Sequence, residues 1–147
     1  RAPRAVIRDA TPADAPVLAR LQSSLPEPSP GLLDSALDGS ALTPATVLVS
    51  TADGEVGQPV AYLLAVPGDG TTYVAELVVD PDHRREGRAR ALLSACAART
   101  DEDAALTVTV SPDNEAARSL YRACGFAEER RLPDFFDGGD AVLYRRD

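Results

Sequence analysis

Residues 83–93, HRREGRARALL, place four arginines and one glycine directly after an apolar run and before alanines and leucines. The pattern predicts a strand, a short loop and a helix over residues 87–99. The first turn of a helix leaves backbone N–H groups without partners and carries the positive end of the helix dipole. An anion bound there would satisfy both, and the small residues Gly87 and Ala89 would let it approach the backbone. A diphosphate group fits this description.

The segment also fits a helix start without a ligand, in which its arginines pair with acids of the same loop. The arginines are Arg84, Arg85, Arg88 and Arg90, and the acids are Asp80, Asp82 and Glu86. The sequence contains neither G-x-x-x-x-G-K-[ST] nor G-x-G-x-x-G, which excludes a P-loop and a dinucleotide-binding turn. Two hypotheses therefore remain, a local anion cradle and a solvated helix end.

The composition is acidic: Asp and Glu total 23 against 15 basic residues, all of them arginine, and the formal net charge is −8. A protein that binds nucleic acid needs a basic face, so nucleic acid is not an expected partner. A single phosphate-bearing ligand held locally is compatible with this charge. An acidic, aspartate-rich surface keeps a protein soluble at high salt and favours a halophilic source, with GC bias of the genome as the alternative.

The length of 147 residues is typical of one domain, so a single domain over residues 1–147 is expected. The apolar runs are too short to cross a bilayer, and residues 1–12 contain no apolar block of signal-peptide length. We therefore expect no membrane partner and a cytoplasmic location. Cys96 and Cys124 fall in or at the end of expected helices, which favours buried free thiols over a disulfide.

Hydrophobic periodicity predicts seven strands and four helices. The strands are expected at 5–8, 46–50, 59–66, 71–79, 105–110, 126–132 and 141–145, and the helices after Thr11, over 32–39, over 87–99 and from Ser111 to Gly125. Thr11 and Ser111 are the expected N-caps, and Gly39 and Gly125 follow helix ends. The resulting order β-α-α-β-β-β-α-β-α-β-β indicates a mixed α/β fold with helices packed on a sheet.

A second segment, LTVTVSPDNEAARSLYRACGF, combines a strand with Asn114, Tyr121 and a Gly-Phe pair. Together with LVVDPDHRREGRARALL it resembles the GNAT superfamily of acyl-coenzyme A dependent N-acetyltransferases, whose motif Q/R-x-x-G-x-G/A is matched by Arg84, Gly87 and Ala89. The similarity is strongest over residues 72–126. The closing residues GFAEERRLPDFFDGGDAVLYRR are similar to those of the ribosomal-protein alanine N-acetyltransferase branch.

The resemblance implies a GNAT fold, with a mostly antiparallel mixed sheet of six to seven strands splayed at the cofactor site and about four flanking helices. It implies acetyl-CoA as the acyl donor, without a metal. The pantetheine arm would bond to Leu77, Val78 and Val79 like an extra strand. The diphosphate would lie on the N–H groups of Arg85, Glu86, Gly87, Arg88, Ala89 and Arg90. Asn114 would bond to the cofactor arm, although helix capping is an equal and compatible role.

The resemblance makes Tyr121 the general acid that protonates the leaving thiolate, with a core aromatic as the alternative role. The branch carries a glutamate five residues before the Asn, where this sequence has Thr109, which cannot act as a base near neutral pH. Glu76 is the nearest substitute, and its alternative role is a strand-end acid paired with an arginine. His83 is expected in solvent beside the cradle. An amine that arrives neutral would need no base.

The implied function is transfer of an acetyl group from acetyl-CoA to a primary amine, by direct attack in a ternary complex. The acceptor is a protein N-terminal α-amine or, alternatively, a small amine or antibiotic, and a non-catalytic acyl-CoA sensor is the alternative outside enzymes. The expected assembly is a monomer or a homodimer. Phe135 and Phe136 are expected in the loop between the last two strands, where the branch carries tyrosines. Their missing hydroxyls, with Thr109, argue against alanine specificity.

Overall fold

The computed structural model of the chain describes residues 6–25, 28, 30–40, 44–52, 57–100, 103–136 and 139–147. Its strands form one seven-stranded sheet in the order β1-β2-β3-β4-β5-β7-β6. The elements are β1 (Val6–Asp9), η1 (Pro12–Asp14), α1 (Ala15–Gln22), α2 (Pro30–Asp38), β2 (Thr46–Thr51), β3 (Pro59–Pro67), β4 (Thr71–Val79), η2 (Pro81–His83), α3 (Arg88–Arg99), β5 (Ala105–Val110), α4 (Glu115–Ala123), β6 (Ala127–Phe136) and β7 (Gly139–Arg146).

This architecture confirms the expected mixed α/β fold, the order of its elements and the splayed, mostly antiparallel sheet. Only β4 and β5 pair in parallel among the described strands. Residue 5 of the first expected strand lies outside the described residues. Phe135 and Phe136 were wrongly expected in a loop, because β6 continues to Phe136, which pairs with Gly139 across the final hairpin.

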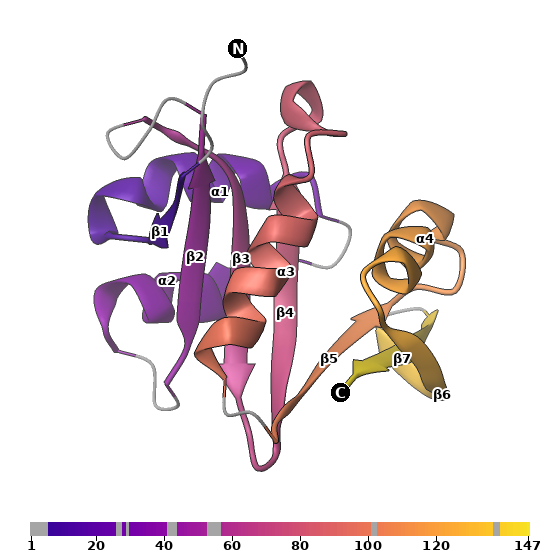
Figure 1. Ribbon diagram of the computed structural model, residues 1–147. Helices are drawn as coiled ribbons and strands as arrows, with labels where there is room; N and C mark the ends of the chain where they lie inside the picture. Colours follow the sequence, from indigo (N-terminus) through magenta and orange to yellow (C-terminus); the bar gives the residue numbers. More distant parts are fainter. Residues whose placement is uncertain are drawn as a thin grey trace.

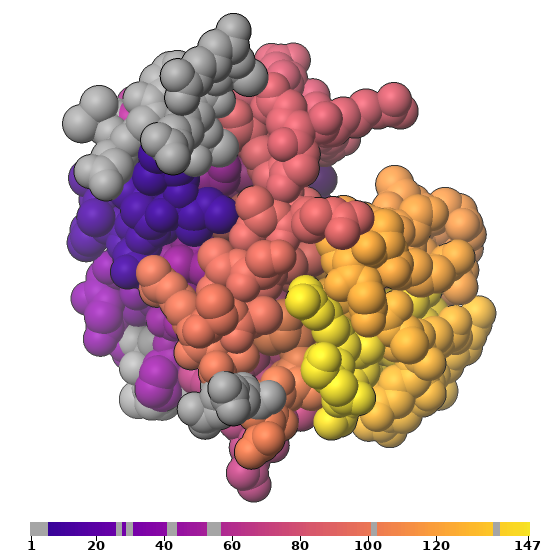
Figure 2. All heavy atoms as spheres, viewed as in Figure 1, coloured from indigo at the N-terminus to yellow at the C-terminus, as the bar shows by residue number. Residues whose placement is uncertain are grey.

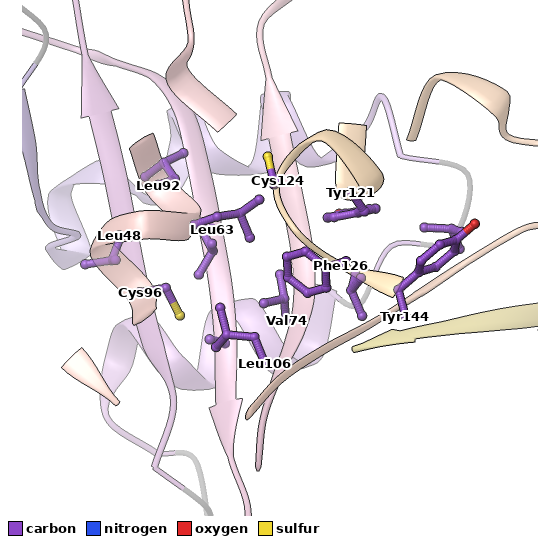
Figure 3. Close-up of a cluster of buried hydrophobic side chains, with 14 of the residues drawn as sticks. Leu48, Leu63, Val74, Leu92, Cys96, Leu106, Tyr121, Cys124, Phe126 and Tyr144 are labelled. Atoms are coloured by element: carbon purple, nitrogen blue, oxygen red, sulfur yellow. The ribbon is translucent and has the colours of Figure 1, made fainter. Parts of the chain in front are cut away.

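Two layers of helices cover the two faces of the sheet (Figure 1). Helices α1 and α2 bury Leu18 and Leu33 against Val49 and Leu64 of the sheet. On the opposite face, α3 and α4 cover the larger cluster, which Figure 3 shows with Tyr121, Phe126 and Tyr144 close together. This cluster contains Leu48, Ala61, Leu63, Ala65, Val74, Leu92, Leu93, Cys96, Leu106, Val108, Val110, Tyr121, Cys124, Phe126, Val142 and Tyr144. Both cysteines are buried and free, as expected.

A β-bulge in β4 reverses the direction of its side chains. Leu64 of β3 pairs with Glu76 and the next residue, Ala65, pairs with Val74, so Ala75 is an extra residue in β4. Val74 therefore lies in the core under α3, whereas Val78 lies in the core under α1 and α2. Since a bulge shifts the alternation of a strand by one residue, Glu76 also faces α1.

Strands β4 and β5 separate after a short stretch of pairing. Their ladder runs from the pair Thr71 and Ala105 to the pair Val74 and Val108. Beyond it β4 continues to Val79 and β5 turns away, as Figure 1 shows. Among the described residues, the peptide groups on this side of β4 after Val74 therefore have no strand beside them.

The helix ends agree with the expected caps except at α4. Asn114, and not Ser111, is its N-cap: the Asn114 Oδ1 accepts a hydrogen bond from the Ala117 N–H at 3.1 Å. Ser111 belongs to the preceding turn, in which its carbonyl accepts from the Asn114 N–H at 3.0 Å. Gly125 follows α4 with a φ of 92°, which favours glycine.

Asp14 connects the first strand to the first helix. Its carboxylate accepts hydrogen bonds from the Arg8 guanidinium at 2.8 and 3.1 Å and from the Thr11 N–H at 2.8 Å. The hydrogen bond from Arg8, more than any other cause, holds the pKa of the Asp14 carboxyl below its usual range. Folding therefore favours the charged carboxylate.

We predict that Asp14→Asn lowers the free energy of unfolding by about 1–2 kcal/mol at about pH 7, because the charged partner of Arg8 is lost. A carboxyl with a lowered folded pKa stabilises the fold above its unfolded pKa of about 3.9, and this contribution disappears as the pH falls through the folded pKa. The difference in the free energy of unfolding between wild type and Asp14→Asn should therefore shrink below about pH 4. Urea unfolding at several pH values measures this difference.

Asp34→Asn on the exposed face of α2 is the matched control, with an expected change under about 0.5 kcal/mol. Equal stability of wild type and Asp14→Asn at neutral pH would contradict the prediction.

Candidate active site

A cleft with a volume of about 950 Å³ lies where β4 and β5 separate. Its walls come from β4, β5, α4, the residues between α1 and α2, and the hairpin of β6 and β7. The lining residues are Leu25, Pro28, Leu32, Tyr73, Val74, Ala75, Glu76, Leu77, Val108, Thr109, Val110, Ser111, Pro112, Asp113, Asn114, Ala117, Tyr121, Arg131, Phe135, Phe136, Gly139 and Asp140. Figure 2 shows the surface hollowed between α4 and the segment that precedes α3.

Tyr121 lines this cleft from α4 and is nearly buried. Its ring packs edge-on against Phe126, with 5.4 Å between ring centroids. Burial, with smaller contributions from Cys124 and Tyr73, raises the pKa of the Tyr121 phenol above its usual range. The phenol is therefore protonated at neutral pH and can donate a proton.

Glu76 is an interior residue of β4 whose side chain is only 3% exposed, yet it lines the cleft. The Gln22 Nε2 of α1 lies 3.0 Å from each carboxylate oxygen, and the Tyr62 hydroxyl of β3 donates to Oε1 at 2.9 Å. Burial and the nearby Glu76 charge raise the pKa of Tyr62, which keeps this hydroxyl a donor. Glu76 thus lies in a buried polar network in the interior of β4 and not at a strand end, where its alternative role would place it.

Thr109 forms a bridge across the two separating strands. Its hydroxyl lies 2.6 Å from the hydroxyl of Tyr73 on β4. Thr109 is the residue of β5 that follows Val108, the last residue of β5 that pairs with β4. Both residues line the cleft. Sequence reasoning did not identify Tyr73, Tyr62 or Gln22, because no sequence spacing connects them to Thr109 or Glu76 across different elements.

The N-terminus of α3 presents free backbone donors. Within the described ranges, the N–H groups of Arg88, Ala89 and Arg90 have no acceptor, and the first helical bond runs from the Ala91 N–H to the Gly87 carbonyl at 3.0 Å. Gly87 has a φ of 77°, and a Cβ added there would meet no atom within 4 Å. The space beside Gly87 is therefore open, while its positive φ favours glycine over residues that carry a Cβ.

The arginine side chains around this loop point in different directions. The Arg84 Nε donates to the Val79 carbonyl at 3.2 Å, and the Arg90 Nη2 donates to the Ala123 carbonyl of α4 at 3.1 Å. Arg88 is buried and pairs with Glu86 at 2.8 Å. Arg85 is exposed, with a φ of 64°. Of the expected pairs between arginines and loop acids, only the pair of Arg88 and Glu86 forms among the described residues.

Of the remaining expected site residues, Leu77 and Asn114 line the cleft, whereas Val78, Val79 and His83 do not. Leu77, Val78 and Val79 follow the last pair of β4 with β5, so their backbone borders the separation. Asn114 lines the cleft and also caps α4, in agreement with the capping role considered from sequence. His83 is partly exposed, and its Nδ1 lies 3.4 Å from the Glu86 carboxylate.

Two further features are absent from the described part of the chain. No group of three or more His, Cys, Asp or Glu side chains has an arrangement that could hold a metal ion. No helix among these residues is long and apolar enough to span a membrane.

Solved structures with the same fold share nearly the whole length of this chain. An acetyltransferase of the GNAT family from Desulfovibrio desulfuricans superposes with a TM-score of 0.82 at 24% identity, over 98% of this chain and 99% of the other. NAA60 of Arabidopsis thaliana, in complex with a bisubstrate analogue, gives 0.80 at 18% identity over 97% of each. A ribosomal-protein alanine N-acetyltransferase from Escherichia coli gives 0.78 at 22% identity, over 97% of this chain and 93% of the other.

Sequence relatives include a mycothiol acetyltransferase of Clavibacter michiganensis, 38% identical over 89 residues, which are 60% of this chain and 28% of that protein. An L-2,4-diaminobutyric acid acetyltransferase of Streptomyces anulatus is 37% identical over 119 residues, which cover 65% of this chain and 64% of the other. The chain thus spans less than two thirds of the length of these relatives. The model of the acetyltransferase (GNAT) family matches residues 17–126, and the chain therefore belongs to this family.

Proposed function

We propose that this protein transfers an acetyl group from acetyl-CoA to a primary amine by direct attack in a ternary complex. The proposal rests on the cleft at the separation of β4 and β5, which Tyr121 lines, taken together with the free amides at the start of α3. Similar structures include NAA60 in complex with acetyl-CoA. The single domain, the cytoplasmic location and the monomeric or homodimeric state remain predictions from the sequence.

The donor half of the site consists mainly of backbone groups. The free N–H groups at the start of α3, with Gly87 in front of them, would hold the diphosphate of acetyl-CoA. The edge of β4 after Val74 would hydrogen-bond to the pantetheine arm, with Leu77, Val78 and Val79 as the proposed contacts. Acetyl-CoA supplies a thioester whose acetyl carbon accepts the amine and whose thiolate departs.

The transfer needs one proton donor and one proton acceptor. As the amine nitrogen bonds to the acetyl carbon, the carbon–sulfur bond breaks and Tyr121 donates its proton to the thiolate. A backbone N–H near Val79 is the proposed donor to the acyl oxygen. Glu76 takes the proton released by the amine, directly or through water, while Gln22 and Tyr62 hold its carboxylate in place. The proton returned to Tyr121 comes from solvent.

The acceptor end of the cleft favours an amine that carries an apolar group close to its nitrogen. Phe135 and Phe136 pack edge-on there, with ring centroids 5.1 Å apart, and Leu25 and Leu32 line the cleft from the α1–α2 side. The solved neighbours that act on protein N-termini support a peptide acceptor. The curated relatives, named for mycothiol and diaminobutyric acid, support the second candidate, a small-molecule amine.

A panel of amines tests the proposal. The panel contains short peptides with free N-termini that differ in their first residue, their N-terminally blocked counterparts, and small amines with and without a carboxylate. We expect thiol release from acetyl-CoA with at least one free amine and none with the blocked peptides. Binding of acetyl-CoA without thiol release from any amine would favour the non-catalytic sensor.

We predict that Tyr121→Phe lowers kcat by at least about tenfold, since the proton donor to the thiolate is lost. The ring and its packing on Phe126 remain, so the affinity for acetyl-CoA should stay within about twofold of wild type. Thiol release and calorimetry measure the two quantities. Tyr144→Phe is the control, because that buried hydroxyl accepts from Arg118 and does not line the cleft. Equal turnover of wild type and Tyr121→Phe would remove Tyr121 from the mechanism.

We predict that Glu76→Gln lowers kcat/KM and removes the rise of the rate with pH on its acidic side, because only a deprotonated carboxylate can accept the amine proton. Glutamine keeps the shape of the side chain, so loss of structure is a separate effect that circular dichroism detects. The measurement is kcat/KM as a function of pH. A pH profile identical to that of wild type would mean that Glu76 is not the base.

A further inference from the structure

Arg88 is the first residue of α3, yet its side chain does not extend into the space in front of the helix. The side chain is 7% exposed. Its Nε donates to the Glu86 carboxylate at 2.8 Å, and its Nη1 donates to the Ser50 hydroxyl at 2.9 Å and to the Thr51 carbonyl at 3.3 Å. The guanidinium is thus directed into the protein, toward the end of β2.

These contacts fix one end of the loop between β4 and α3. Its other end is fixed by the Asp80 N–H, which donates to the Val60 carbonyl of β3 at 2.8 Å. The pairing of β2 with β3 shifts by one residue at Ser50 and Thr51, where Val60 has no partner of its own. Both ends of the loop are therefore attached to the same irregular end of the sheet, and the free amides of α3 follow the second attachment.

Glu86 is an acid inside the proposed diphosphate cradle. Its side chain is 47% exposed and lies between Arg85 and Gly87 in the chain. The hydrogen bond from Arg88, the largest cause, lowers the pKa of the Glu86 carboxyl, so this group is charged at neutral pH. A free carboxylate here would repel a diphosphate, whereas the Arg88 guanidinium offsets the charge of the carboxylate that it pairs with.

We propose that Arg88 is a positioning residue for diphosphate binding. It holds the first turn of α3 against β2 and keeps the Glu86 carboxylate out of the cradle, and its guanidinium does not touch the phosphates. This inference rests on the proposed binding of acetyl-CoA.

Calorimetric titration with CoA tests the inference. Arg88→Gln should weaken CoA binding by about tenfold, since a buried charged hydrogen-bond donor is lost and Glu86 is released. The value of kcat at saturating acetyl-CoA should change by less than about twofold, so the defect appears in KM for acetyl-CoA. The double variant Arg88→Gln/Glu86→Gln should bind CoA at least about threefold more tightly than Arg88→Gln, because the repelling charge is gone.

Two further variants separate this role from general stability. Arg8→Gln removes another arginine that pairs with a carboxylate, on β1 and outside the cleft, and should lower Tm without changing CoA affinity. Ser50→Ala removes one anchor of Arg88 by a smaller change and should weaken CoA binding by about threefold, which keeps the test valid if Arg88→Gln does not fold.

Wild-type CoA affinity in Arg88→Gln or Ser50→Ala would overturn the inference and leave the proposed function intact. Equal affinities of Arg88→Gln and the double variant would also overturn it, since the role assigned to Glu86 would be absent. Failure of the wild-type chain to bind CoA would overturn the proposed function and this inference together.

Discussion

Strand β4 pairs with β3 along nearly its whole length but with β5 only over its first half. The candidate site lies at the edge of β4 where the pairing with β5 has ended. After the pair of Val74 and Val108, the backbone of β4 toward β5 has no strand partner in the part of the chain that the structure describes. Unpaired peptide groups inside a protein are unfavourable unless water or a ligand satisfies them. The adjacent start of α3 leaves a second set of free donors only a short loop away. The edge of β4 and the start of α3 thus provide two sets of backbone groups that a ligand could satisfy.

The buried carboxylate of Glu76 is the second costly feature of the same region. A charged group inside a protein is tolerated only where hydrogen bonds replace its water, and Gln22 and Tyr62 provide them from α1 and β3. The bulge at Ala75 is what turns Glu76 toward these partners. The extra residue Ala75 therefore interrupts the regular pairing of β4 with β3. It also determines that Glu76 contacts α1.

Periodicity and turn residues were enough to predict the elements of this fold. The strands at 71–79 and 105–110 have the expected bounds, and Gly87 stands where the backbone adopts a positive φ ahead of α3. The bulge at Ala75 could not be predicted, because β-branched and apolar residues indicate a strand equally well whether or not that strand contains one extra residue. It also could not connect Gln22 to Glu76, since 54 residues separate them and only the packing of α1 on the sheet brings them together.

The directions of side chains also could not be predicted from the sequence. Four arginines in one segment indicate a cation cluster, but the structure sends Arg88 to β2 and Arg90 to the end of α4. Asn114 caps α4 in place of the expected Ser111, because the residues from Ser111 to Asn114 form a separate turn. Such choices depend on neighbours that only the folded chain provides.

The two halves of the cleft differ in what they are made of. The half beside α3 consists largely of main-chain groups, whose geometry depends on the fold and changes little when surface side chains are exchanged. The other half, with Phe135, Phe136, Arg131 and Thr109, consists of side chains on strand ends and a hairpin. In the proposed transferase, mutation could therefore diversify the amine that is accepted while the acyl donor is retained, which would make one scaffold suited to many substrates over evolutionary time.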